Sequence, residues 1–205
     1  MGFRLTNPSM VKSRYSYNKY ELEYDSLFID IPLEIIIETS FYQPVYPVEE
    51  HEVSSFVGRF YQTRNIVYPT PFEASIFNMK IQSLERTFVD KVFAVCDYRL
   101  QNMRDRDSRH LYDLAKILPK IDLNGDMKTL VDRVRLDRMT SKNNPSAQPE
   151  HNIPDMLKEI VISRFYESDY NNLTTKLLYE NVSYDEAVNR GIAVIADLDL
   201  FAFRP

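Results

Sequence analysis

The architecture of this chain follows from two stretches, SLERTFVDKVFAVCDYRL (residues 83–100) and SRHLYDLAKIL (residues 108–118). In both stretches apolar residues recur every three to four positions, which is the spacing of an amphipathic helix. A short charged connector separates them, so we expect two antiparallel helices that form a hairpin. Arg86, Asp90 and Asp97 share one side of the first helix, and we expect that side to face solvent.

Lys91 lies away from that charged side, and its helical neighbours three, four and seven positions along carry no charge. An ammonium at the edge of an apolar stripe is costly unless it reaches solvent or meets an anion. Asp113 borders the apolar stripe of the second helix, and a helical hairpin would bring it towards Lys91. Two interpretations remain open: a structural ion pair that locks the hairpin, or a Lys and an Asp that line a polyanion site.

These stretches resemble the AbiEii/AbiGii-type nucleotidyltransferase toxins of bacterial toxin–antitoxin and phage abortive-infection systems. That family carries a Glu-then-Lys helix followed by an Arg-Asp-x-x-Asp helix. The matching residues here are Glu85, Lys91, Arg109 and Asp113. His110 departs from the pattern, because the family usually has an acid at that position. The resemblance continues through KNNPSAQ (residues 142–148) and LLYENVSYDEAV (residues 177–188).

The resemblance implies transfer of NMP from an NTP to an RNA acceptor, such as a tRNA end, and inhibition by a cognate antitoxin protein. It also implies Mg²⁺ and NTP as cofactors of a complete enzyme. In such an enzyme Lys91 would be catalytic, contacting the triphosphate and offsetting charge on the leaving pyrophosphate. Asp113 would position Lys91 or the acceptor hydroxyl, and Arg109 would assist in phosphate binding.

The metal-binding half of such a site is not recognisable in the sequence. The family binds its metal through a Gly-Ser turn followed by Asp-x-Asp on a strand, and no Gly-Ser turn precedes an acidic pair here. Two acidic pairs, at residues 105–107 and 197–199, lack that context. We therefore expect the chain to match the carboxyl-terminal portion of the family, to bind neither cofactor tightly and to be inactive in transfer. Truncation, a split reading frame and degeneration remain alternative origins.

One candidate metal ligand remains, in the run FIDIPLEIIIETSF (residues 28–41). Its β-branched residues predict a strand that is buried on both faces. Glu38 matches the strand acid that serves the family as third metal carboxylate. The alternative is that Glu38 is a solvent-side glutamate of a half-exposed sheet, the reading that we favour for Glu34.

The order of the predicted elements indicates an α+β fold. Strands are expected at residues 17–25, 28–41 and 75–81, with a short helix near residues 53–60 inside a proline-bearing connection. From Ser83 onward the chain reads as helical. We therefore divide it into a partial nucleotidyltransferase-type sheet region, residues 1–82, and a carboxyl-terminal helical bundle, residues 83–205, that carries the Lys/Asp motif.

Composition narrows the class of protein. The 205 residues carry a net charge of −5, which argues against a general basic nucleic-acid binder but leaves room for a local patch that handles RNA ends. The single cysteine, Cys96, excludes intramolecular disulfides, and its place on the apolar side of the first helix predicts a core residue. No run of residues is long enough to cross a bilayer, so we expect a cytoplasmic protein without membrane contact.

A charged run between Lys128 and Lys142 has two interpretations. Such runs are usually solvated helix faces, and the alternative is a face that contacts phosphate. The rival to an enzyme is a non-catalytic module that binds an antitoxin or RNA, in which Lys91 and Asp113 form a structural pair.

Overall fold

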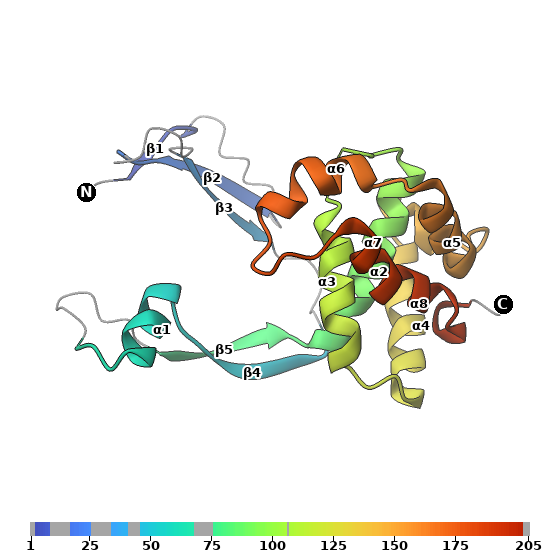
Figure 1. The fold of residues 1–205 in the computed structure, drawn as a ribbon, viewed down its shortest axis with the longest axis horizontal. Coiled ribbons are helices and arrows are strands. Elements are labelled where there is room, and N and C mark those ends of the chain that lie inside the picture. Colours follow the sequence, from blue (N-terminus) through green and yellow to red (C-terminus); the bar gives the residue numbers. More distant parts are fainter. Residues whose placement is uncertain are drawn as a thin grey trace. The chain divides into compact units, whose positions relative to one another are not determined.

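The computed structural model describes residues 3–8, 17–25, 34–40, 46–67, 76–105 and 107–202. The chain divides into two compact units, residues 1–45 and residues 46–205. Small sheets and several helices make up the described residues, which confirms the predicted α+β class (Figure 1). The functional division expected after residue 82 falls between a strand and a helix of the second unit, and it stays a prediction.

The first unit contains one antiparallel sheet with the strand order β1-β2-β3. The strands are β1 (Arg4–Leu5), β2 (Tyr17–Glu23) and β3 (Glu34–Ser40). Lys19 pairs with Glu38 across β2 and β3. The two predicted strands are thus confirmed within the described residues; residues 28–33 and 41 of the second prediction lie outside them, and β1 was not predicted.

The prediction that β3 is buried on both faces is wrong. Ile35, Ile36 and Ile37 remain 39%, 50% and 44% exposed. A strand is buried on both faces only when other layers cover its sheet, and no helix occurs among the described residues of this unit. The β-branched run therefore predicted the strand correctly but not the layers around it.

The second unit begins with an antiparallel hairpin of β4 (Val48–Val53) and β5 (Phe77–Gln82). The predicted strand at residues 75–81 is confirmed as β5. Helix α1 (Phe56–Thr63) lies between the two strands in sequence and begins three residues later than expected, because the Ser55 side chain caps it by accepting the Gly58 N–H at 2.9 Å. Strand β4 was missed, since its acidic sequence lacks an apolar alternation.

From Ser83 onward the described chain is helical, as predicted. The α-helices are α2 (Leu84–Leu100), α3 (Arg109–Ile117), α4 (Gly125–Met139), α5 (Ile153–Ser163), α6 (Glu167–Asn172), α7 (Tyr184–Arg190) and α8 (Ile192–Ala196). Short 3-10 helices are η1 (Leu118–Lys120), η2 (Pro145–Ala147), η3 (Thr174–Lys176) and η4 (Asp199–Phe201). Ser83 starts α2 by accepting the Arg86 N–H with its hydroxyl at 3.2 Å.

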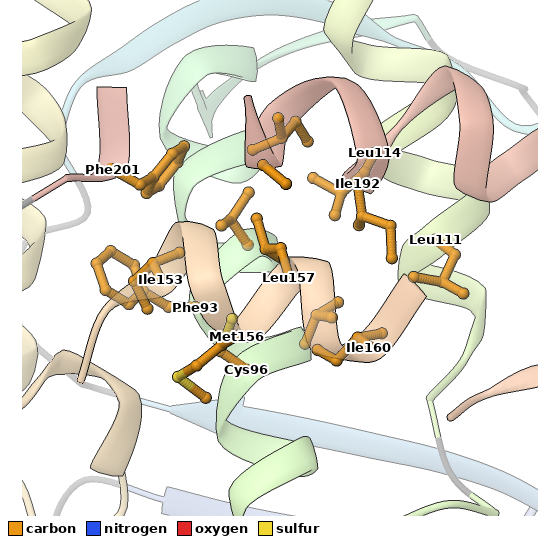
Figure 2. Close-up of a cluster of buried hydrophobic side chains, with 14 of the residues drawn as sticks. Phe93, Cys96, Leu111, Leu114, Ile153, Met156, Leu157, Ile160, Ile192 and Phe201 are labelled. Carbon is orange, nitrogen blue, oxygen red and sulfur yellow. The ribbon is translucent and has the colours of Figure 1, made fainter. Parts of the chain in front are cut away.

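The core of the second unit lies around α2, which packs against α3, α4, α5 and η2. Side chains from α2, α3, α5, α8 and η4 interdigitate there (Figure 2). Fully buried members include Phe93, Leu111, Leu157 and Ile192. Cys96 is buried among them, which confirms the predicted core position, and burial raises the pKa of its thiol well above the ordinary value.

The side of α2 that carries Arg86, Asp90 and Asp97 does not face solvent, so that prediction is wrong. The Arg138 guanidinium of α4 donates to Asp90 Oδ1 at 3.2 Å and to Asp97 Oδ2 at 2.7 Å. The N–H of Ser146, in η2, donates to Asp97 Oδ1 at 2.8 Å. Oppositely charged partners cover this side of α2, and their hydrogen bonds compensate the burial of its carboxylates.

Two arginines in the charged run serve packing, whereas Arg133, Asp137 and Lys142 are exposed, as the solvated-face interpretation expected. Arg135 is 2% exposed and donates to the carbonyl oxygens of Ala147, Gln148 and His151 at 2.9, 2.8 and 2.7 Å. Together with Arg138 it fixes the polar stretch after α4 against α2. These two arginines therefore hold the helices together and are not free to contact a phosphate.

Candidate functional site

The α2–α3 hairpin brings Lys91 and Asp113 together, as the spacing predicted. Lys91 Nζ donates to Asp113 Oδ2 at 2.6 Å. The two side chains are half-buried, with 22% and 33% of their surfaces exposed. An ammonium and a carboxylate thus meet at the rim of the core, where each retains access to solvent.

His110 completes a cluster with Lys91 and Asp113. Its Nδ1 lies 3.3 Å from Lys91 Nζ and 3.8 Å from Asp113 Oδ2. In the tautomer whose Nδ1 is unprotonated, this nitrogen accepts from Lys91, because an ammonium can only donate; in the tautomer whose Nδ1 is protonated, it is directed as a donor to Asp113. The ring is stacked on Tyr98, with centroids 6.0 Å apart and an angle of 8° between the planes. The sequence had marked His110 only as a departure from the family motif, and its position between Arg109 and Asp113 was the available signal.

The electrostatics of the cluster keep Asp113 ionised. Burial by itself would raise the pKa of Asp113, but the contacts with His110 and Lys91 outweigh it and leave that pKa below its ordinary value. Lys91 has three N–H donors, of which Asp113 and His110 take two. One donor on an oriented cation remains for a further acceptor, such as a phosphate oxygen.

The structure does not bring the other two helix-motif residues into the cluster. Arg109 lies in the first turn of α3 with 64% of its side chain exposed, and it forms an ion pair with Asp107 at 3.3 Å. Glu85 lies in the first turn of α2 and lines a separate pocket of about 270 Å³ beside Asp122 and Asp126. The cluster proper therefore consists of Lys91, His110 and Asp113.

Glu38 lies in the first unit, on β3. Its Oε1 accepts a hydrogen bond from the Tyr17 hydroxyl at 2.5 Å, and this bond raises the pKa of Tyr17. Lys19 is its cross-strand partner. Among the described residues, no group of three or more His, Cys, Asp or Glu side chains could hold a metal ion. A single carboxylate opposite a lysine does not by itself fit a magnesium site.

Neither alternative acidic pair lies on a strand. Asp107 precedes α3 and pairs with Arg109, whereas Asp105 lies in the connector. Asp197 ends α8 and lies 3.7 Å from Lys158 Nζ, and Asp199 begins η4. The strand geometry that would present two carboxylates to one metal ion is thus not found at either pair.

Comparison with known proteins adds one finding. The family model described as "Nucleotidyl transferase AbiEii toxin, Type IV TA system" matches residues 2–190. This range includes β3 of the first unit and the whole Lys91 cluster. No curated protein and no solved structure gave a significant match. Within the part of the chain that the structure describes, no helix is long and apolar enough to span a bilayer.

Proposed function

The chain belongs to the AbiEii family of nucleotidyl transferase toxins from Type IV toxin–antitoxin systems, and from this premise we propose that the Lys91 cluster binds the triphosphate of an NTP, from which a complete enzyme of the family would transfer NMP to an RNA acceptor. The acceptor would be a tRNA or a similar RNA end. The activity would be exercised in the cytoplasm and held in check by a cognate antitoxin.

The observation that carries the proposal is how the Lys91 ammonium is hydrogen-bonded and how far it is exposed. Asp113 and His110 hold it from two sides, its third N–H has no partner among the residues that the structure describes, and 22% of the side chain stays exposed. A cation with a fixed direction and a free donor is suited to a phosphate oxygen. In the reaction, Lys91 would offset charge on the departing pyrophosphate while Asp113 maintains its direction. Arg109, exposed four residues before Asp113, would assist with a second phosphate.

The family implies Mg²⁺, and the described residues do not fit it. Glu38 accepts from Tyr17 and faces Lys19 across the sheet, and among the described residues it belongs to no group of three or more possible metal ligands. We propose that triphosphate binding is a property of this chain and that transfer is not, because the paired aspartates that hold the metal in the family have no counterpart in the sequence.

Binding of inorganic tripolyphosphate, measured by isothermal titration calorimetry, tests the proposal. The variants Lys91→Ala and Asp113→Ala should both weaken binding, Lys91→Ala by about tenfold or more, since one charge-assisted hydrogen bond is worth about 1.5–3 kcal/mol. Lys128→Ala is a matched control, because Lys128 also donates to a carboxylate, Asp132, at 2.6 Å. Equal weakening by Lys91→Ala and Lys128→Ala would contradict the proposal.

A transfer assay with each labelled NTP, Mg²⁺ and total tRNA completes the test. We expect no incorporation. Incorporation that disappears in Lys91→Ala and Asp113→Ala would show that the chain holds a metal pair, and residues 105–107 and 197–199 would be examined next. Restoring a Gly-Ser and Asp-x-Asp segment upstream should produce transfer if only the metal half is missing.

The second candidate is a non-catalytic module that binds antitoxin or RNA. It is favoured by the direct Lys91–Asp113 ion pair between two packed helices, which suffices to explain both residues structurally. The stability of Lys91→Met distinguishes this candidate from the triphosphate-binding function. A structural pair should lose about 3 kcal/mol when one half-buried charge is left alone, whereas a lysine kept for function should be removable with little loss or with some gain.

A further inference from the structure

A second cationic site lies one helical turn beyond Asp113. A pocket of about 550 Å³ opens between the end of α3, η1 and the junction of α7 with α8. Its polar lining comes from Lys116, Lys120, Asn189 and Arg190, and its apolar part includes Leu118 and Val194. Neither the family motif nor the proposed triphosphate contact uses any of these residues.

The pocket depends on an unusually close packing of backbones. A Cβ on Gly191 would lie 2.8 Å from Ala187 O and 3.1 Å from the backbone nitrogen of Ala115. Only glycine lets the α7–α8 junction approach α3 this closely. The walls that carry Arg190 and Lys116 are therefore fixed by helix packing and not by the chance orientation of surface side chains.

The charges of the pocket leave a positive excess. Lys116 Nζ donates to the Glu180 carboxylate at 2.6 Å, and Arg190 pairs with Glu186 at 2.7 Å. Lys120 has no salt bridge within the described residues, although its charge also acts on Glu180. Three cations thus face two carboxylates in a chain whose net charge is −5. Glu180 occupies the position of an internal anion that a stronger anionic ligand could displace.

The place of the pocket points to a ligand that continues from the Lys91 cluster. Lys116 follows Asp113 by three residues, so the two lie on one face of α3. A nucleic-acid strand whose end lies at the Lys91 cluster would lay its next phosphates along this face. Phosphates are positioned by Lys and Arg, and sugars or bases rest on apolar surface such as that of Leu118 and Val194.

We propose that this pocket binds a backbone phosphate of a single-stranded RNA end, with Lys120 and Arg190 as its phosphate contacts and with Glu180 displaced from Lys116 on binding. The assignment of this RNA as the acceptor rests on the proposed function. The binding site itself rests on the pocket, on its charges and on its position along α3.

Fluorescence anisotropy with a labelled eight-nucleotide oligouridylate tests the pocket in the full chain. The double variant Lys120→Gln with Arg190→Gln should lower affinity about tenfold at low salt. It should also reduce the slope of log K against log salt by about 0.7, the value for one neutralised phosphate of a single strand. The double variant Lys142→Gln with Lys158→Gln is the charge-matched control, since Lys142 is exposed and Lys158 is 52% exposed on α5 and pairs only loosely with Asp197. An equal loss in the control would overturn the proposal.

Glu180→Gln provides a variant that should gain binding. The amide removes the internal anion and frees Lys116, so oligouridylate affinity should rise severalfold. A misfolded protein cannot produce such a gain. Unchanged or weaker binding by Glu180→Gln would overturn the displacement that we propose.

Tripolyphosphate titrations of the same variants separate this proposal from the preceding one. The pocket variants should bind tripolyphosphate like the wild type, and Lys91→Ala should still bind oligouridylate within a few fold. A wild-type chain that binds tripolyphosphate but not RNA would overturn the pocket proposal alone. A wild-type chain that binds RNA but not tripolyphosphate would overturn the triphosphate proposal and would not affect the pocket proposal.

Discussion

The Arg138 guanidinium of α4 lies 2.7 Å from the Asp97 carboxylate of α2, and only 17% and 5% of the two side chains are exposed. The same guanidinium reaches Asn144 Oδ1 at 3.2 Å, and its centre lies 5.4 Å from the centre of the Phe93 ring. A single side chain thus joins two helices and the polar stretch that follows α4. This ion pair, and not solvent, is the environment of the charged side of α2.

Arg138→Met should therefore destabilise the protein strongly. It leaves the Asp97 carboxylate buried without its cation, and breaking a buried pair in this way costs about 3–5 kcal/mol. The free energy of unfolding from urea titration measures the loss. Arg133→Met, at an exposed position of the same helix, should change it by less than about 1 kcal/mol. Similar losses in both variants would mean that the pair contributes little.

This pair also marks where prediction from sequence ends. The periodicity of residues 84–100 is local, so helix α2 and its apolar stripe could be predicted. Whether the remaining side meets water depends on Arg138, which lies 41 residues further along. Arg86, Asp90 and Asp97 at helical spacing are typical of a solvated face, and nothing near them in the sequence indicates a covering cation.

The candidate site shows the same division between local and distant information. Lys91 and Asp113 were predictable because each breaks an apolar helical stripe and both lie on one hairpin. The contact of His110 with Lys91 could not be predicted, because it depends on the rotation of α3 about its axis. The pocket of Lys120 and Arg190 was also unpredicted, because it arises where α7 packs on α3, and no sequence spacing encodes that contact.

Gly191→Ala should destabilise the helical part of the second unit. The new methyl group would meet two backbone atoms, Ala187 O and the Ala115 nitrogen, and backbone yields less readily than a side chain. Overpacking of this kind costs about 1–3 kcal/mol. Gly125→Ala is the control: no atom lies within 4 Å of its Cβ, so it should be neutral or stabilise by up to about 1 kcal/mol. Thermal unfolding followed by circular dichroism compares the two.

Asp113 should contribute to stability in a pH-dependent way. Its pKa is lower in the folded than in the unfolded chain, because the contacts with His110 and Lys91 outweigh the effect of burial. As pH falls, the unfolded chain therefore takes up this proton first, and the contribution of Asp113 is lost. It is fully present above about pH 5, declines as the pH falls through the ordinary aspartate pKa of about 3.9, and is gone only below the lower pKa of the folded chain.

Asp113→Asn should accordingly be less stable than the wild type near neutral pH, and the difference should shrink as the pH is lowered towards about 3. Melting temperatures at several pH values measure this difference. Asp137→Asn, at an exposed position of α4, should show a small difference that does not change with pH. A constant difference for Asp113→Asn would contradict the linkage.

His110 should act on Lys91 as a hydrogen-bond acceptor, a role that two substitutions can separate from packing. His110→Asn keeps an acceptor near the position of Nδ1, whereas His110→Leu fills the space without one. Both lose the stacking on Tyr98, so both should lose similar stability. Tripolyphosphate affinity should stay within about threefold of the wild type for His110→Asn and fall about five- to tenfold for His110→Leu, because one hydrogen bond contributes about 1 kcal/mol. Equal affinities of the two variants would show that His110 supports α3 by packing alone, and that Asp113 suffices to direct the ammonium of Lys91.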